Sequence, residues 1–149
     1  MSTALSALSA LSAALAALAV LAPAAAAAAD PAAEVASSYS VKASAEPASL
    51  KAGAAGSIRL AIEPTGAVHV DPKAPLKVTL SATPGLTLQK TQLGRAEAVQ
   101  AGQGLTFAAA FTASAAGKQE VKARLDFFLC TDQWCVKQLR DVTVLVDVK

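Results

Sequence analysis

Alternation of hydrophobic and polar residues is the feature that most constrains how this chain can fold. In Val121–Leu129 every odd-numbered position is hydrophobic, and Lys122, Arg124 and Asp126 lie between them. Successive side chains of a β-strand point to opposite faces, so this pattern predicts a strand with one buried and one solvent-exposed face.

Similar alternating segments recur along the chain, and each ends at turn residues such as proline or glycine. We predict strands at Tyr39–Ala45, Ser57–Glu63, Leu76–Leu80, Leu86–Leu88, Leu105–Ala113, Val121–Cys130 and Val142–Val148. Residues 68–75 are predicted as an edge strand or a loop, and 91–104 as the least structured part. About seven short strands, with no helical pattern after residue 30, predict an all-β, immunoglobulin-like antiparallel β-sandwich. A closed barrel is the alternative.

The N-terminal segment has the layout of a secretory signal. The first 29 residues contain no charged side chain, and Ala4–Leu21 consists almost entirely of Ala, Leu and Ser. Pro23 and a run of alanines ending at Ala29 follow, which suits a small-residue cleavage site. We predict a signal peptide at 1–29, a flexible leader at 30–38 and one domain at 39–149. The alternative is an uncleaved membrane anchor, since about 18 apolar residues are the minimum span.

Export determines the expected environment of the domain. After signal cleavage we expect a periplasmic or secreted protein with no membrane association, where a disulfide bond persists. The net charge is only +2 and aromatic residues make up 4% of the chain. Because the charges of both signs are interspersed, nothing in the composition favours binding to nucleic acid.

Both cysteines, Cys130 and Cys135, stand at the ends of a four-residue turn near the C-terminus. The two ends of such a turn lie opposite each other in an antiparallel hairpin, which allows Cα atoms about 5.5 Å apart and a disulfide bond. Closing a six-residue loop contributes only about 2 kcal/mol to stability on the chain-entropy formula. Pure stabilisation is therefore a modest benefit of this pair.

The neighbours of the cysteines favour chemistry at the turn. Trp134, Phe127 and Phe128 are expected to shield the sulfurs, and Lys137 and Arg140 to stabilise a thiolate, whereas Asp132 would oppose it. A shielded but reachable sulfur at a loop tip suits thiol–disulfide exchange, in which an external thiolate attacks one sulfur.

Other chemistries have little support in the sequence. Two cysteines and the single histidine, His69, give at most three soft metal ligands, and His69 is remote in sequence from the cysteines. We therefore expect no metal site and no cofactor. The chain also lacks a nucleophile-elbow motif and a glycine-rich phosphate loop.

The cysteine hairpin also points to a family. The segment Leu125–Cys135, followed by the strand Val142–Val148, resembles the N-terminal periplasmic domain of the thiol:disulfide interchange protein DsbD family. The preceding order agrees, with Ser49–Gly53 leading into a strand and Val68–Val70 standing before Pro75.

The resemblance implies an immunoglobulin-like sandwich whose two cysteines face each other on the last hairpin. In that family they pass electrons from a membrane-embedded partner to periplasmic oxidoreductases. The resemblance implies that Cys130 and Cys135 are the redox pair and that Trp134 is a local shield. It also implies a cap loop over the cysteines, for which 68–75 and 91–104 are the candidates.

Two functions remain open at this point. In the first, the domain takes part in thiol–disulfide exchange with a protein that has a reactive thiol pair, either a membrane thiol transporter or a thioredoxin-like protein. In the second, it is a non-enzymatic exported binding or structural module with an inert disulfide. The sequence leaves open whether the chain acts as an oxidoreductase component.

Overall fold

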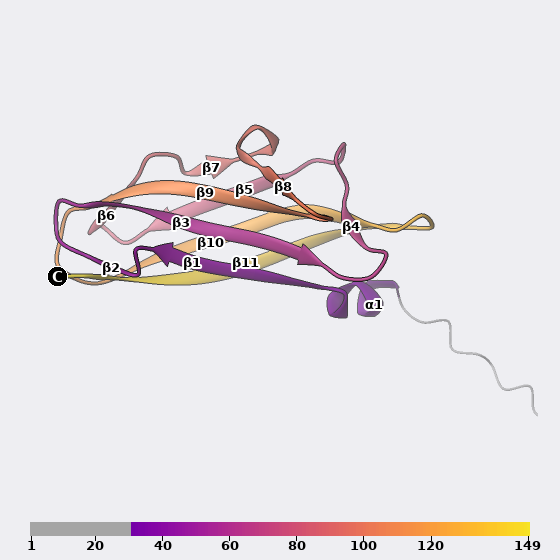
Figure 1. Cartoon of the computed structure of the whole chain (residues 1–149), viewed down its shortest axis with the longest axis horizontal. Helices are drawn as coiled ribbons and strands as arrows, with labels where there is room; N and C mark the ends of the chain where they lie inside the picture. The colour runs from indigo at the N-terminus through magenta and orange to yellow at the C-terminus, as the bar shows by residue number, and fades with distance from the viewer. Residues whose placement is uncertain (1–30) are drawn as a thin grey trace, which may run out of the picture.

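The computed structural model describes residues 31–149 (Figure 1). The predicted signal peptide, 1–29, lies outside the described residues. The elements are α1 (Pro31–Ser37), β1 (Tyr39–Glu46), β2 (Ser49–Leu50), β3 (Ala55–Pro64), β4 (His69–Val70), β5 (Lys77–Ala82), β6 (Leu86–Leu88), β7 (Gln92–Leu93), the 3-10 helix η1 (Arg95–Glu97), β8 (Val99–Ala101), β9 (Gly104–Ala113), β10 (Gly117–Cys130) and β11 (Cys135–Val148). No helix within 31–149 combines the length and apolar character needed to cross a bilayer.

Two sheets pack face to face. One has the order β1-β3-β9-β6, with β8 also paired to β9. The other has the order β2-β11-β10-β5-β7, with β4 also paired to β10. Neither sheet closes on itself, so the immunoglobulin-like β-sandwich is confirmed and the closed barrel is not formed.

The core lies between the two sheets and follows the predicted alternation. The odd-numbered residues from Val121 to Leu129 are each at most 2% exposed. The largest fully buried side chains include Phe111 of β9, Phe127 of β10 and Ile58 of β3. This burial fixes which face of β10 points inward, and it leaves the even-numbered side chains on the outer face.

Strand β11 begins at Cys135, seven residues before the predicted start at Val142. The sequence missed this part because its inward position 138 is a glutamine, which interrupts the hydrophobic alternation. Gln138 is only 8% exposed, and its Oε1 accepts a hydrogen bond of 2.8 Å from the Tyr39 hydroxyl. Tyr39 also packs edge-on against Phe127 and lies under the Arg140 guanidinium. Burial raises the pKa of Tyr39, against the effect of Arg140.

The segment predicted as a flexible leader contains a helix, α1, which corrects the expectation of no helix after residue 30. Val35 of α1 is fully buried, and the Ser38 hydroxyl donates a hydrogen bond of 2.9 Å to the Val35 carbonyl. A seven-residue helix is too short to show a hydrophobic period in the sequence. The buried side chain of Val35 therefore packs α1 against the sandwich, and a single hydrophobic residue gives no periodic pattern in the sequence.

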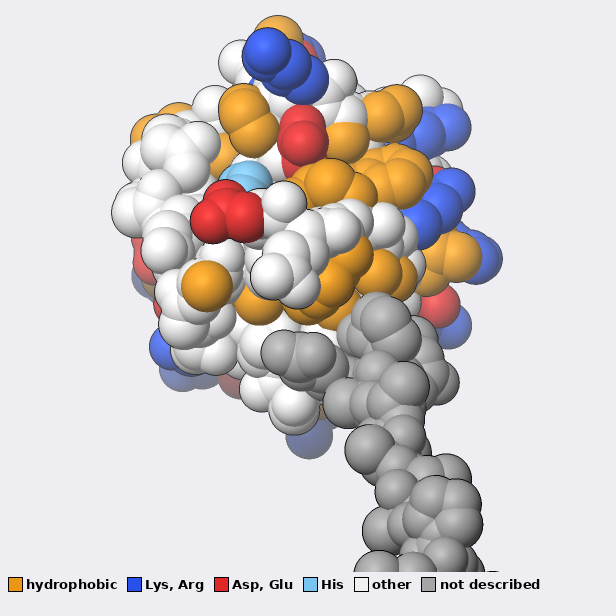
Figure 2. Space-filling model, turned by 90° about the vertical axis from the view of Figure 1, so that its right-hand side faces the viewer, with side chains coloured by type: hydrophobic (Ala, Val, Ile, Leu, Met, Phe, Trp, Pro, Cys, Tyr) orange, Lys and Arg blue, Asp and Glu red, His pale blue; other side chains and the backbone are white. Residues whose placement is uncertain are grey.

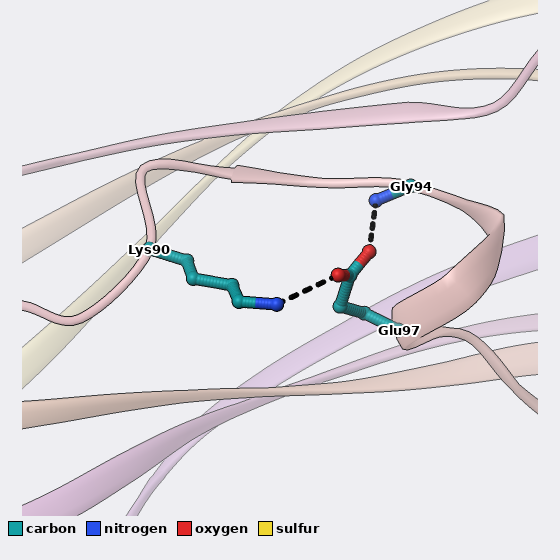
Figure 3. A network of polar contacts seen from close by, with 3 residues as sticks. All are labelled: Lys90, Gly94 and Glu97. Carbon is teal, nitrogen blue, oxygen red and sulfur yellow. Dashed lines mark hydrogen bonds and ion pairs between the residues drawn. The ribbon is translucent and has the colours of Figure 1, made fainter.

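The segment 91–104, predicted as the least structured part, contains β7, η1 and β8. Glu97 makes local polar contacts here (Figure 3): its carboxylate accepts hydrogen bonds from Lys90 Nζ and from the Gly94 backbone N–H, both at 2.8 Å. These two contacts hold the pKa of Glu97 below its usual value. Strands β7 and β8 have only two and three residues, too few to show an alternating pattern, which explains why the sequence showed no strand here.

Candidate functional site

The candidate site is the disulfide Cys130–Cys135 at the turn between β10 and β11. The register places the two residues directly opposite each other, with Cα atoms 4.1 Å apart. This is close to the spacing of about 4.5 Å for a pair that does not exchange backbone hydrogen bonds. The Thr131 N–H closes the turn by donating to the Trp134 carbonyl at 2.8 Å. The predicted hairpin and the disulfide bond are confirmed.

The two sulfur-bearing residues differ sharply in exposure. Cys130 is 3% exposed, whereas Cys135 is exposed. The cause is the position of each strand in its sheet. Strand β10 is central here, with β11 on one edge and β4 on the other, and His69 lies opposite Cys130. Within 31–149, the strand pairing on the far edge of β11 is confined to Asp147 and Val148, so Cys135 lies at a sheet edge.

The residues after β4 cover Cys130 and bring a carboxylate to it. The Asp71 N–H donates to the Phe128 carbonyl at 3.1 Å, which continues the pairing of β4 with β10. Asp71 Oδ2 lies 3.5 Å from Cys130 Sγ. A disulfide sulfur carries no hydrogen, so in the oxidised protein this is a contact without a hydrogen bond.

The Asp71 carboxylate is fixed in place and ionised at neutral pH. Its Oδ1 accepts the backbone N–H groups of Lys73 at 2.6 Å and Ala74 at 2.7 Å. These two hydrogen bonds are the main cause that lowers the pKa of Asp71. A negative charge beside Cys130 disfavours the thiolate form of that cysteine after reduction.

Arg95 of η1 braces the segment that carries Asp71. Its Nη2 donates to the Asp71 carbonyl at 2.7 Å and to the Ala74 carbonyl at 3.0 Å. Of the two candidate cap loops, 68–75 therefore contacts a cysteine, and 91–104 contacts 68–75 through Arg95.

The residues predicted to assist the cysteines lie in different places. Phe128 and Lys137 are opposite each other, on the same face as the cysteines, and Phe128 is half-buried. Lys137 Nζ pairs with Asp126 Oδ2 at 2.9 Å, so its charge is directed to that carboxylate. Trp134 is partly buried and packs against the hydrophobic core. On the other edge of β10, β4 pairs alongside Cys130 and the Asp71 carboxylate contacts its sulfur.

A shallow hollow of about 290 Å³ lies on the outer face of β10 and β11, and two of its lining residues, Phe128 and Lys137, are each two residues from a cysteine. It is lined by Pro75, Leu76, Lys77, Asp126, Phe128 and Lys137. The end of the molecule that carries the β10–β11 turn shows hydrophobic surface interspersed with acidic and basic side chains (Figure 2). This surface offers both apolar and charged contacts next to the exposed sulfur.

Sequence reasoning missed Asp71 and Arg95 as parts of the site. Asp71-Pro72 is a turn signal, because an aspartate side chain readily accepts backbone N–H groups two or three residues ahead. No local signal shows that this turn pairs with β10, since the contact joins residues 59 positions apart.

Comparisons with known proteins give no family for this chain. No family model matches it, and no curated protein matches it. Among solved structures it is similar to AggA, the major subunit of aggregative adherence fimbriae type I from Escherichia coli, at 7% identity and a TM-score of 0.39. That likeness covers 74% of this chain and 94% of AggA. The CooA pilin subunit of enterotoxigenic Escherichia coli is similar at 12% identity and a TM-score of 0.26, over 74% of this chain and 99% of CooA. Both TM-scores are low, and these likenesses carry no conclusion about function.

Proposed function

We propose that this protein is an exported thiol–disulfide exchange domain in which the Cys130–Cys135 bond opens and re-forms in use. The observation that carries the proposal is the unequal placement of the two sulfurs. Cys135 is exposed at a sheet edge, and Cys130 is buried beside the Asp71 carboxylate. Exchange needs one sulfur that an external thiolate can reach, and this arrangement offers Cys135.

The exchange is written for the direction in which this protein accepts electrons. A partner thiolate attacks Cys135 Sγ, the Cys130–Cys135 bond breaks, and its electron pair leaves on Cys130 Sγ. That sulfur takes up a proton and, as a thiol, can donate its S–H to Asp71 Oδ2. A second partner thiolate then attacks the partner sulfur of the mixed disulfide and releases Cys135 as a thiolate, which is protonated in turn. Two electrons and two protons move from the partner dithiol to this protein.

The same geometry serves the reverse direction. The reduced protein attacks a target disulfide with the Cys135 thiolate, and Cys130 then resolves the mixed disulfide. The partner class is thus a protein with a reactive thiol pair, either a membrane thiol transporter or a thioredoxin-like protein. The predicted signal peptide and the persistence of disulfides outside the cytoplasm support a periplasmic or secreted location.

The second candidate is an exported binding or structural module with an inert disulfide. It is favoured by the burial of Cys130, since a sulfur that is 3% exposed is protected from reductants. The two candidates differ in whether Cys135 forms adducts with a partner.

The test compares two single-cysteine variants, Cys130→Ser and Cys135→Ser. Each is mixed with a thioredoxin-type protein that retains one active-site cysteine, activated as a mixed disulfide with a small aromatic thiol. We expect the Cys135 thiolate of Cys130→Ser to displace the aromatic thiolate and give a protein–protein disulfide on a non-reducing gel. Cys135→Ser, which retains only the buried sulfur, should give little.

The control is the double variant Cys130→Ser/Cys135→Ser, with circular dichroism to show that every variant is folded. Exchange is excluded as the function if folded Cys130→Ser gives no adduct. Equal adduct yields from both single variants would contradict the assignment of Cys135 as the attacked sulfur.

A further inference from the structure

Three potential metal-ligand atoms meet at the β10–β11 turn. Cys130 Sγ, Cys135 Sγ and a carboxylate oxygen of Asp71 all lie within 4.8 Å of one another. The sequence argued against a metal site because its single histidine, His69, is remote in sequence from the cysteines. The fold supplies a third ligand of another kind, because the turn after β4 pairs with β10.

The ligand set fits a borderline or soft divalent cation. Thiolate sulfur is preferred by Zn²⁺ and by softer ions such as Cd²⁺, and Zn²⁺ also accepts carboxylate oxygen. Two thiolates and one carboxylate carry three negative charges, which exceed the charge of a divalent cation by one. Lys137, two residues after Cys135, is paired with Asp126, so its charge is already balanced.

The third ligand is held ready for an ion. Asp71 Oδ1 is occupied by the N–H groups of Lys73 and Ala74, which leaves Oδ2 directed at Cys130 Sγ. Hydrogen bonds of this kind orient metal-binding carboxylates in known sites. Exposed Cys135 gives an ion a path from solvent and leaves a fourth coordination position open to water.

We propose that the reduced protein binds one such cation, with Zn²⁺ as the reference ion, through Cys130, Cys135 and Asp71. The site exists only in the reduced state. A dithiol reductant first transfers two electrons and two protons to the disulfide, and the cation then displaces the two thiol protons to form two metal–thiolate bonds of about 2.3 Å. The proposal goes beyond the exchange function and needs only that the bond can be reduced, whether or not a protein partner does so.

The test titrates Cd²⁺ into the full domain after chemical reduction and removal of the reductant, and it follows the ultraviolet thiolate-to-metal charge-transfer absorption. We expect one Cd²⁺ per chain in the reduced protein and no charge-transfer band in the oxidised protein. Loss of an outer-shell partner alone weakens metal sites about 10- to 100-fold, so Asp71→Asn should weaken binding at least as much, by about 100-fold.

The matched control is Asp132→Asn, which removes an exposed carboxylate from the same turn. It should bind Cd²⁺ as the wild-type protein does. The proposal is overturned if Asp71→Asn and Asp132→Asn bind equally well, or if oxidised and reduced proteins bind Cd²⁺ with the same affinity.

A second measurement, the Tm with and without Zn²⁺, tests the proposal even if reduction or substitution destabilises the fold. Zn²⁺ should raise the Tm of the reduced wild-type protein, because it binds the folded state in preference to the unfolded chain. The same addition should leave the Tm of reduced Asp71→Asn nearly unchanged. An equal rise in both proteins would show that Asp71 is not a ligand.

Discussion

The segments 68–75 and 91–104 look alike in sequence, yet only the first contacts the disulfide. Both are short of regular structure and rich in turn residues. In 68–75, the Asp71 N–H binds the Phe128 carbonyl of β10, and the Asp71 carboxylate reaches Cys130. In 91–104, the Glu97 carboxylate is satisfied by its neighbours Lys90 and Gly94 (Figure 3).

The difference separates a loop that contributes a charged group to the cysteine site from one that only contacts that loop. The segment 68–75 places a carboxylate against Cys130, whereas 91–104 pairs with β5 through β7 and with β9 through β8. Arg95 joins the two by binding the carbonyls of Asp71 and Ala74, and the Val70 N–H donates to the Gln103 carbonyl at 2.9 Å. Asp71 of 68–75 therefore contacts the disulfide, and Arg95 of 91–104 holds the backbone of 71–74 in place.

The largest expected effect, on the free energy of unfolding, comes from truncating the buried hydrophobic side chain of each segment. Leu93 is 3% exposed and Val70 is 5% exposed. Leu93→Ala should destabilise the domain by about 2–4 kcal/mol and Val70→Ala by about 1–3 kcal/mol, as measured by urea unfolding. Only Val70→Ala should also speed the alkylation of Cys130 in reduced protein, because Val70 pairs with Leu129 and so holds β4 against β10 next to Cys130. Equal alkylation of both variants would remove the distinction between the segments.

The next effect concerns the two carboxylates. Asp71→Asn should raise the rate at which a small dithiol reduces the disulfide by about tenfold, because attack at Cys135 then expels Cys130 without charge repulsion and a better leaving thiolate leaves faster. Glu97→Gln, the matched control in the other segment, should leave the rate unchanged. The account is wrong about Asp71 if its replacement slows reduction or has no effect.

Removing the Arg95 hydrogen bonds between the two segments should have a smaller effect on stability. Arg95→Met removes two hydrogen bonds to backbone carbonyls while keeping most of the side-chain volume. We expect a loss of about 1 kcal/mol in the free energy of unfolding. Arg124→Met is the control, since Arg124 is exposed and lies 4.0 Å from Asp141, and it should cost less. Similar losses from both substitutions would mean that Arg95 does not hold the cap segment.

The smallest effect is the pH dependence of stability. The pKa of Asp71 and that of Glu97 are both lower in the folded protein than their ordinary values. Each carboxylate therefore contributes stability that is present at a pH well above the ordinary pKa values of 3.8 for Asp71 and 4.5 for Glu97, and that is lost as the pH falls through the folded pKa. Asp71→Asn and Glu97→Gln should each lose less Tm than the wild type between pH 7 and acid conditions. An acid-induced loss identical to that of the wild type would contradict the assignment.

The fold was largely predictable because alternation directly encodes which face of a strand is buried. The same reasoning placed Cys130 opposite Cys135, since a short turn between two strands fixes the register. It failed where one residue decides the structure, as Val35 does for α1, or where a polar residue takes an inward position, as Gln138 does in β11. It also failed for Asp71, because the pairing of β4 with β10 is a long-range contact that no local pattern records.

The most direct test of the central claim is the reduction potential of the Cys130–Cys135 pair, measured by equilibration against glutathione or thioredoxin buffers. A pair that opens in use should have a potential between about −120 and −270 mV, the span of known exchange proteins. A potential below about −300 mV, in the range of structural disulfides, would contradict the account and leave the hairpin with an inert bond.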